Sequence, residues 1–188
     1  MELSNVLKKR KSIRSYIPKP VDRDLILRCI DAAHLAPSAC NIQPWKFIIV
    51  DDPDIKEKLI NESLSGVHSF NQFVQNAGAL VVVVARKDLL THKLFASLQG
   101  TQFYLLDIGA ACENFILKAT ELGIGTCWLG WFNEKKTKKI LHIPRMLKIP
   151  SIIAVGHYDE TEYESKERQR KNIKEVYSFN RYEKIPGE

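Results

Sequence analysis

The order of hydrophobic and polar residues along the chain predicts several helices. Behind Asp22, a residue that can cap a helix, apolar side chains recur at helical spacing up to Ala33, and Pro37 ends the pattern. Residues 98–122 form the longest helical pattern. This pattern is apolar on most of its circumference, as is typical of a helix buried in a core or in a subunit contact. Shorter helices are predicted at residues 3–10, from Pro53 behind a cap at Asp52 to about residue 64, and from Asn133 to about residue 141.

Strand patterns are fewer and more widely spaced. Residues 79–85 are a continuous apolar run, which predicts a strand buried on both faces. Further strands are predicted at residues 46–50 and 149–155, with a short extended stretch at 126–129, whereas 65–78 resists assignment. The strands do not alternate regularly with helices, and no Gly-x-Gly-x-x-Gly follows a strand, so a dinucleotide-binding Rossmann fold is disfavoured. The pattern favours an α+β or three-layer domain.

Length and composition fit one globular domain spanning residues 1–188. Hydrophobic residues make up 45% of the 188, an ordinary share for such a domain. No apolar run reaches the roughly 18–20 residues of a membrane helix, and the first residues lack the apolar core of a signal peptide, so we expect a soluble cytoplasmic protein. The four cysteines have no close spacing, which makes a disulfide framework or a cysteine metal site improbable.

The chain is basic, with a formal net charge of +6 and an isoelectric point near 9.1. Its positive residues cluster at 8–14, 135–148 and 166–174, which suits anionic ligands such as phosphorylated cofactors or nucleic acid. The middle cluster is explained more simply as the solvated face of a helix. The five histidines show no metal-ligand spacing, so no metal site is expected, and no catalytic triad can be assigned.

One loop carries the side chains best suited to bind a ligand. It joins a predicted helix to a predicted strand between Pro37 and Pro44, which fix the backbone at both ends. Between them, Ser38, Asn41 and Gln43 can present hydrogen-bonding groups to a ligand. The alternative is that these side chains only cap their own backbone.

This loop and a basic segment near the N-terminus resemble the signatures of the FMN-dependent nitroreductase superfamily. The loop matches as Pro37-Ser38-Ala39-Cys40-Asn41-Ile42-Gln43-Pro44-Trp45, and the basic segment as Arg10-Lys11-Ser12-Ile13-Arg14. The likeness continues through Asp107-Ile108-Gly109-Ala110-Ala111, Gly123-Ile124-Gly125-Thr126-Cys127-Trp128 and Arg168-x-Arg170. One motif alone would be weak evidence for the resemblance, whereas five motifs in the family's order are strong evidence for it.

The resemblance implies a fold, an assembly and an activity. The fold would be a three-layer α/β/α domain of the α+β class, with a central mixed, mostly antiparallel sheet. Two copies would form an intertwined homodimer with FMN in each of two interface clefts. NAD(P)H would deliver hydride to flavin N5, and the flavin would then reduce a nitroaromatic, a quinone or a similar small-molecule acceptor. Because both substrates would use one cleft, ping-pong kinetics are expected.

The resemblance also assigns roles to individual residues. Arg10 and Arg170 would bind the FMN phosphate, since the guanidinium fork matches phosphate oxygens, with Ser12 adding a hydroxyl and Lys11 and Arg168 nearby. Arg14 would lie beside flavin N1 and the C2 carbonyl, where its charge favours the reduced flavin. The partner subunit would contribute Pro37, Ser38, Ala39 and Asn41. Backbone near flavin N5 would come from Trp128, Leu129 and Gly130.

Other interpretations stay open at this point. Arg14 could instead form a surface ion pair with Asp22 or Asp24, and Arg168 and Arg170 could belong to a solvated tail. Four aromatic residues could cover a substrate, although each such residue is more often part of a core than a substrate contact: Phe70, Phe73, Trp131 and Phe132. Two rival functions are an FMN sensor or storage protein without turnover and, with less support, a basic nucleic-acid-binding module.

Overall fold

The computed structural model describes residues 1–86, 101–164 and 169–184. Its helices are α1 (Leu3–Lys9), α2 (Arg23–His34), α3 (Pro53–Ser63), α5 (Phe103–Glu121), α6 (Glu134–Ile140) and α7 (Glu160–Glu164). Its strands are β1 (Trp45–Val50), β2 (Ala79–Ala85), β3 (Gly125–Leu129) and β4 (Lys148–Gly156). Short 3₁₀ turns occur at Ala39–Asn41, Gly66–Asn76 and Ile173–Glu175.

The four strands form one sheet in the order β1-β2-β4-β3, and each neighbouring pair is antiparallel. In register, Val82 lies between Ile48 and Ile152. A parallel component comes from the N-terminal segment, where Ser12 bridges to Thr126. There the Ile13 N–H donates to the Thr126 carbonyl at 2.8 Å. Among the described residues, the sheet is therefore antiparallel apart from this one parallel bridge at the edge of β3.

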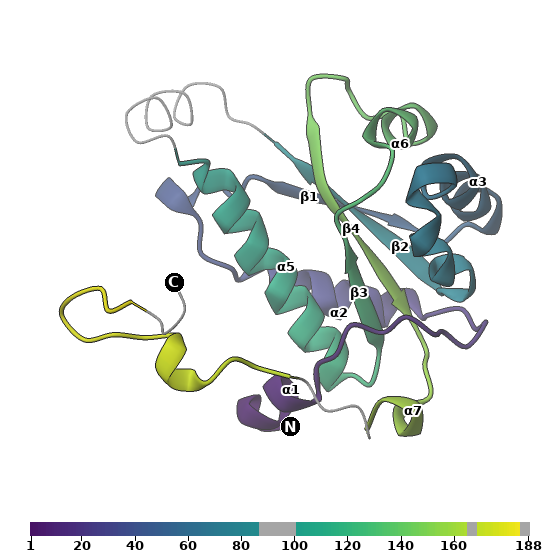
Figure 1. The fold of residues 1–188 in the computed structure, drawn as a ribbon. Coiled ribbons are helices and arrows are strands. Elements are labelled where there is room, and N and C mark those ends of the chain that lie inside the picture. The colour runs from purple at the N-terminus through teal and green to yellow at the C-terminus, as the bar shows by residue number, and fades with distance from the viewer. Residues whose placement is uncertain (87–100, 165–168, 185–188) are drawn as a thin grey trace.

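Helices cover both faces of the sheet, which gives three layers (Figure 1). Every residue of β2 is buried, as its continuous apolar run predicts. Side chains alternate along the strand: Val81 and Val83 join the core beneath α2 and α5, and Leu80 and Val82 join the core on the side of α3. The predicted three-layer α+β arrangement follows from this double burial.

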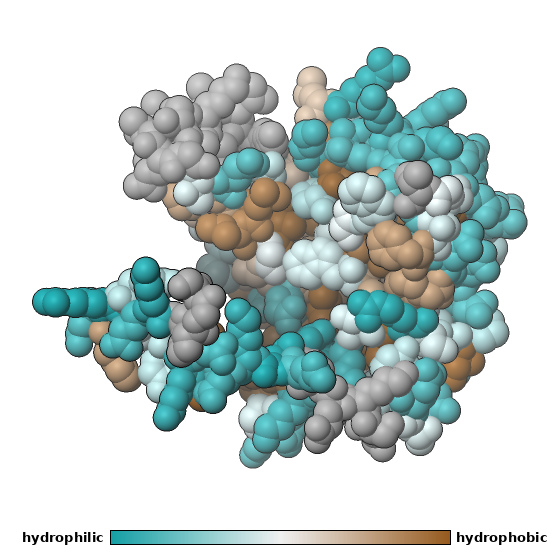
Figure 2. All heavy atoms as spheres, viewed as in Figure 1, coloured by the Kyte–Doolittle hydropathy of each residue, from teal (hydrophilic) through white to brown (hydrophobic). Residues whose placement is uncertain are grey.

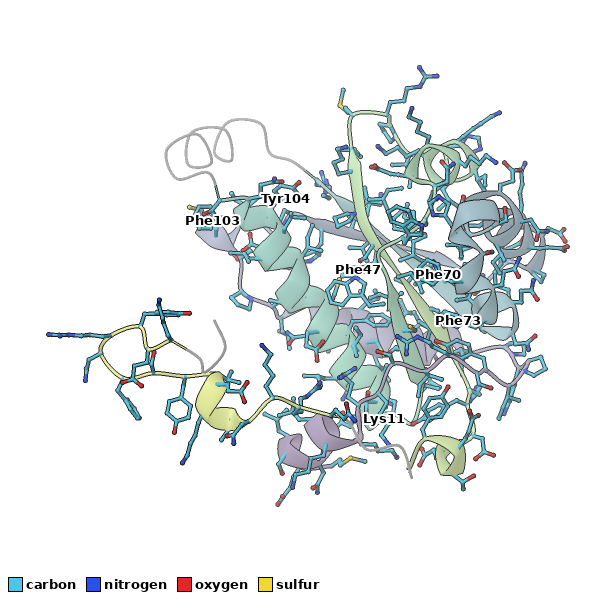
Figure 3. The ribbon with its side chains drawn as sticks, viewed as in Figure 1. Lys11, Phe47, Phe70, Phe73, Phe103 and Tyr104 are labelled. Atoms are coloured by element: carbon cyan, nitrogen blue, oxygen red, sulfur yellow. The ribbon has the colours of Figure 1, made fainter. Side chains whose placement is uncertain are left out.

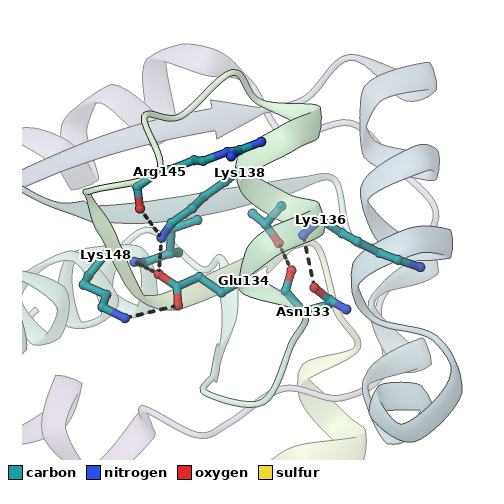
Figure 4. Close-up of polar contacts among 8 residues, drawn as sticks. Asn133, Glu134, Lys136, Lys138, Arg145 and Lys148 are labelled. Atoms are coloured by element: carbon teal, nitrogen blue, oxygen red, sulfur yellow. Dashed lines mark hydrogen bonds and ion pairs between the residues drawn. The ribbon is translucent and has the colours of Figure 1, made fainter.

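The predicted caps are present at the helix starts. The side chain of Asp22 accepts from the Asp24 N–H at 3.0 Å, and that of Asp52 accepts from the Ile55 N–H at 2.9 Å. Asn133 caps α6 by accepting from the Lys136 N–H at 3.1 Å (Figure 4). The observed bounds lie close to those predicted, although residues 98–100 of the longest pattern fall outside the described residues. No described helix is both long and apolar enough to cross a membrane.

The solvated face predicted for α6 is observed, since Lys135, Lys136 and Lys139 are exposed. Glu134 pairs with the half-buried Lys138 of the same helix at 2.8 Å and with Lys148 of β4 at 3.9 Å (Figure 4). The same carboxylate accepts from the Ile149 N–H at 3.1 Å. These bonds lower the pKa of Glu134, although its partial burial acts in the opposite direction. The cluster thus attaches α6 to the first residues of β4.

Two glycines allow the N-terminal segment to pass close to the sheet. A Cβ at Gly125 would lie 2.7 Å from Tyr158 and 2.9 Å from Ile13, and one at Gly156 would lie 2.7 Å from the Tyr16 ring. These separations are shorter than side chains tolerate. The absence of a side chain at both positions therefore permits the basic segment to lie along β3.

Candidate functional site

The basic segment at the end of α1 runs along the edge of β3. Ser12 is half-buried at the bridge to Thr126, while the Arg14 side chain is exposed. The Arg10 guanidinium is half-buried, with Nε 3.8 Å from Glu113 Oε1 on α5. The described residues form no ion pair between Arg14 and Asp22 or Asp24, so that alternative is not observed. Ser12 and Arg14 thus lie along β3, and the Arg10 guanidinium lies against α5.

Helix α7 anchors this segment through three contacts. Lys9 pairs with Glu160 at 2.9 Å, and the Lys11 ammonium donates to the Tyr163 carbonyl. The Arg14 backbone N–H donates to the Tyr163 hydroxyl at 2.8 Å. The Lys11 ammonium is thus engaged by α7, and Lys11 lies between α1 and α7 (Figure 3). The exposed Arg14 side chain lies near Cys127 of β3, and Arg10 lies against α5.

The C-terminal end of β3 offers both an aromatic surface and open backbone. Trp128 is 41% exposed, Leu129 is buried among core residues and Gly130 is exposed. The following Trp131 is 57% exposed and lies 5.3 Å, between ring centroids, from His68. The burial of Leu129 leaves only its backbone as a ligand contact, in keeping with the main-chain role expected for it.

Among the aromatic residues considered as covers for a substrate, two groups emerge. Phe70 and Trp131 are exposed, whereas Phe73 and Phe132 pack against the core.

Phe73 also stacks on Tyr16, with centroids 6.5 Å apart. Burial raises the pKa of the Tyr16 phenol well above its ordinary value, and Cys127 and Tyr163 raise it further, while Arg14 lowers it. Tyr16 therefore stays protonated and serves the core.

The loop before β1 is tightly folded on itself. Cys40, Asn41 and Gln43 adopt left-handed backbone angles, with φ of 53°, 54° and 51°. The Gln43 N–H donates to Ser38 Oγ at 2.9 Å, and the Gln43 side chain donates to Asn41 at its carbonyl (3.1 Å) and Oδ1 (3.2 Å). The self-capping considered as the alternative is therefore present, while Pro37 and Asn41 remain exposed.

Helix α5 carries both the loop and the basic segment, at different levels. Ala39 donates its N–H to Asp107 at 3.2 Å near one end of the helix, and Arg10 approaches Glu113 further along. Six residues separate the two carboxylates in sequence, which is roughly 9 Å of helical rise. Figure 1 shows α1 towards the opposite end of α5 from this loop. One protomer therefore does not bring Ser38–Asn41 onto its own Arg10 and Arg14.

The face of the molecule formed by α5 and the C-terminal segment is hollowed. Figure 2 shows a recess between α5 and the C-terminal segment, with hydrophobic spheres over the first part of α5 and hydrophilic spheres over much of the C-terminal segment. Leu106 on α5 is 62% exposed, and Leu105 is exposed beside it. Most apolar residues of α5 are buried in the core, as one of the two predicted explanations requires, whereas Leu105 and Leu106 are exposed apolar side chains at its first turn.

The C-terminal segment supplies less of the predicted site within one protomer. Arg170 is exposed in a stretch without helix or strand that precedes the Ile173–Glu175 turn, and Arg168 lies outside the described residues. The stretch carries several exposed apolar side chains, namely Ile173, Val176, Tyr177, Phe179 and Tyr182. The placement of both arginines at a phosphate thus stays a prediction.

Sequence reasoning gave no role to two residues that organise the site. Tyr163 anchors the backbone of Arg14, and Asp107 anchors the loop at Ala39. Asp107 was visible as a carboxylate inside an apolar helical pattern. For Tyr163 no local signal exists, because 149 residues separate it from its partner.

Comparisons with known proteins agree with this architecture. The sequence profile of the Nitroreductase family matches residues 7–157. A relative from Archaeoglobus fulgidus, provisionally named NADH dehydrogenase/NAD(P)H nitroreductase, is 34% identical over 165 residues, covering 85% of this chain and 88% of the relative. The crystal structure of a nitroreductase family protein from Clostridium novyi NT superposes with a TM-score of 0.74 and 35% identity, over 87% of this chain and 92% of that one.

A more distant structure supports the fold alone. A nitroreductase family protein from Clostridium difficile 630 has a TM-score of 0.78 at 23% identity, covering 97% of this chain and all of the other. The fold and the basic edge of β3 thus define a nitroreductase-like α+β protein. The chain belongs to the Nitroreductase family, which confirms the resemblance seen in its motifs.

Proposed function

We propose that the protein is an FMN-dependent oxidoreductase that takes hydride from NAD(P)H and reduces a nitroaromatic, a quinone or a similar small acceptor. The observation that carries the proposal is the bridge between Ser12 and Thr126. This bridge runs the basic segment with Ser12 and Arg14 along β3, which is followed by the exposed Gly130, and this arrangement supports the proposal. The names of relatives such as the Archaeoglobus protein support NAD(P)H as the reductant.

The donor set fits an FMN molecule. A phosphate needs fixed cations and hydroxyl donors, which Arg10, Ser12 and the tail arginine Arg170 offer. The Arg14 guanidinium is exposed, so it is available to contact the electron-rich edge of the flavin ring. Gly130 has no side chain and would let the flat ring approach the backbone. Bound FMN would supply the hydride and electron chemistry, so the protein need only bind, orient and supply charge.

In this proposal, a second copy of the chain completes the FMN site. In one protomer the loop Ser38–Asn41 lies near Asp107, whereas Arg10 approaches Glu113, roughly 9 Å further along α5. The exposed Leu105 and Leu106 and the apolar residues of the tail provide surface for a partner. A homodimer would cover this surface and bring one copy's loop to the other copy's arginines.

A titration with FMN tests the proposal directly. The purified protein should quench FMN fluorescence with a stoichiometry of one per chain, and the yellow complex should bleach with NAD(P)H under anaerobic conditions. Colour should return when a quinone or nitroaromatic is added. Initial rates should give parallel double-reciprocal lines, because both substrates use the same cleft.

A charge-matched pair of variants makes the test specific. Arg14→Ala should lower the reduction potential of the bound flavin, because a positive charge near the ring favours the reduced form. Arg145→Ala removes the same charge from the exposed loop after α6 and should leave the potential unchanged. Protein that binds no FMN would refute the proposal, and a complex that never bleaches would support the sensor instead.

A further inference from the structure

Asp107 has an environment that the proposed site does not yet explain. It is only 8% exposed on α5, a helix that is otherwise largely apolar. Its Oδ1 accepts from the Ala39 N–H at 3.2 Å, while Oδ2 is buried and has no hydrogen-bond partner in the described part of the chain. A carboxylate in such a place costs free energy, so its presence requires a compensating function.

The loop that Asp107 contacts is held in an unusual conformation. Three residues other than glycine have positive φ, a region that L-residues seldom occupy. The bonds from Gln43 to Ser38 and Asn41 close the loop on itself but do not attach it to the rest of the fold. The hydrogen bond from Ala39 to Asp107 provides that attachment to α5.

We propose that Asp107 is a positioning residue, whose Oδ1 fixes Ala39 and thereby holds the loop Ser38–Gln43 in the shape that meets the cofactor. This inference rests on the proposed FMN function for its effect on binding. The anchoring itself is a property of the chain without cofactor. Asp107 acts through the loop and is not itself placed against the flavin.

The geometry distinguishes a hydrogen-bond anchor from a charge effect. Only Oδ1 has a partner among the described residues, so an asparagine can keep the acceptor that Ala39 needs. Its amide group would replace an oxygen that already lacks a partner. Asp107→Ala removes the acceptor as well as the charge.

A second side chain on α5 offers a matched control. Asn114 donates from Nδ2 to the Ala32 carbonyl at the end of α2, at 3.2 Å. Asn114→Ala therefore deletes one hydrogen bond between α5 and a neighbouring element without touching the loop. A merely structural role for Asp107 would make the two alanine variants behave alike.

The experiment compares the wild type with Asp107→Ala, Asp107→Asn and Asn114→Ala in two measurements. Amide hydrogen exchange without FMN reports the loop, and fluorescence titration reports the FMN dissociation constant. In Asp107→Ala the Ala39 and Gln43 amides should exchange faster, and the dissociation constant should rise about tenfold, which equals about 1.4 kcal/mol. The other two variants should stay within about twofold of the wild type.

Wild-type exchange and affinity in Asp107→Ala would overturn the inference, and so would an Asp107→Asn variant as impaired as Asp107→Ala. If the wild type itself fails to bind FMN, the proposed function fails, while the exchange data still decide whether Asp107 anchors the loop. Should Asp107→Ala not fold, Ala39→Pro removes the donor instead. Ser38 is already extended, as proline requires of its predecessor, and faster exchange at Gln43 is then expected.

Discussion

Replacing Tyr163 by phenylalanine removes one oxygen atom from the anchor of the basic segment. The Tyr163 side chain is 8% exposed, and its hydroxyl accepts from the Arg14 backbone N–H at 2.8 Å. Its ring packs edge-on against Tyr158, with centroids 5.8 Å apart, and phenylalanine keeps that contact. The substitution therefore removes the hydroxyl that accepts from Arg14 and keeps the ring.

The size of the effect follows from the lost partner. A buried donor left unpaired costs about 1–3 kcal/mol. Because the Arg14 side chain is exposed and water can reach the segment, we expect about 1 kcal/mol, near the low end of that range. For a chain of this length such a loss lowers Tm by roughly 2–4 °C. A loosened segment must be ordered again on binding, so FMN affinity should fall by up to about fivefold, the equivalent of the same energy.

Thermal unfolding and FMN titration of Tyr163→Phe measure both effects. Tyr16→Phe is the control, because it also removes a buried hydroxyl nearby, but one that makes only a long bond of 3.4 Å to the Ala154 carbonyl. An unchanged Tm together with unchanged FMN affinity would refute the anchor. Affinity reduced far beyond fivefold at constant Tm would refute it too, since the hydroxyl would then act on the ligand directly.

Three further predictions concern the thiols and the glycine at the edge of β3. In cofactor-free folded protein, a thiol reagent should label Cys40 alone, because it is exposed while the other three cysteines are buried, and all four should react after denaturation; rapid labelling of a second thiol in the native state would contradict the fold. Burial raises the pKa of Cys29 and Cys112 to about 12, so the folded state retains protons that unfolded thiols, with a pKa near ~8.5, release. The free energy of unfolding should therefore fall as pH rises from about 9 to 12, and less steeply in a variant with alanine at both positions; equal slopes in urea titrations would count against this. Gly125→Ala should destabilise the fold by about 1–3 kcal/mol, because the new Cβ would lie 2.7 Å from Tyr158, and wild-type stability in urea would show that the segment can shift freely.

Local patterns predicted the sheet and the helices well because the determinants are local. The run at residues 79–85 is apolar at every position, so a strand inside two layers follows directly, and β2 has those bounds. Asp52 followed by Pro53 likewise specifies a helix start without reference to the rest of the fold. The solvated face of α6 was predictable for the same reason.

The candidate site was predictable only in part. The prolines of the loop indicated a stiff turn. The left-handed backbone angles at Cys40 and Gln43 could not be predicted, since neither residue type favours them. The anchors Tyr163 and Asp107 depend on contacts between distant parts of the chain. The proposed meeting of the loop with the arginines needs a second copy, and no pattern in a single chain defines its geometry.

The bridge from Ser12 to Thr126 also bears on solubility. β3 is the outermost strand on its side of the sheet, and an uncovered outer strand invites pairing with other molecules. The segment that we propose to bind a phosphate thus also covers the edge of β3. Proteolysis of this segment would therefore make the protein prone to aggregation as well as inactive.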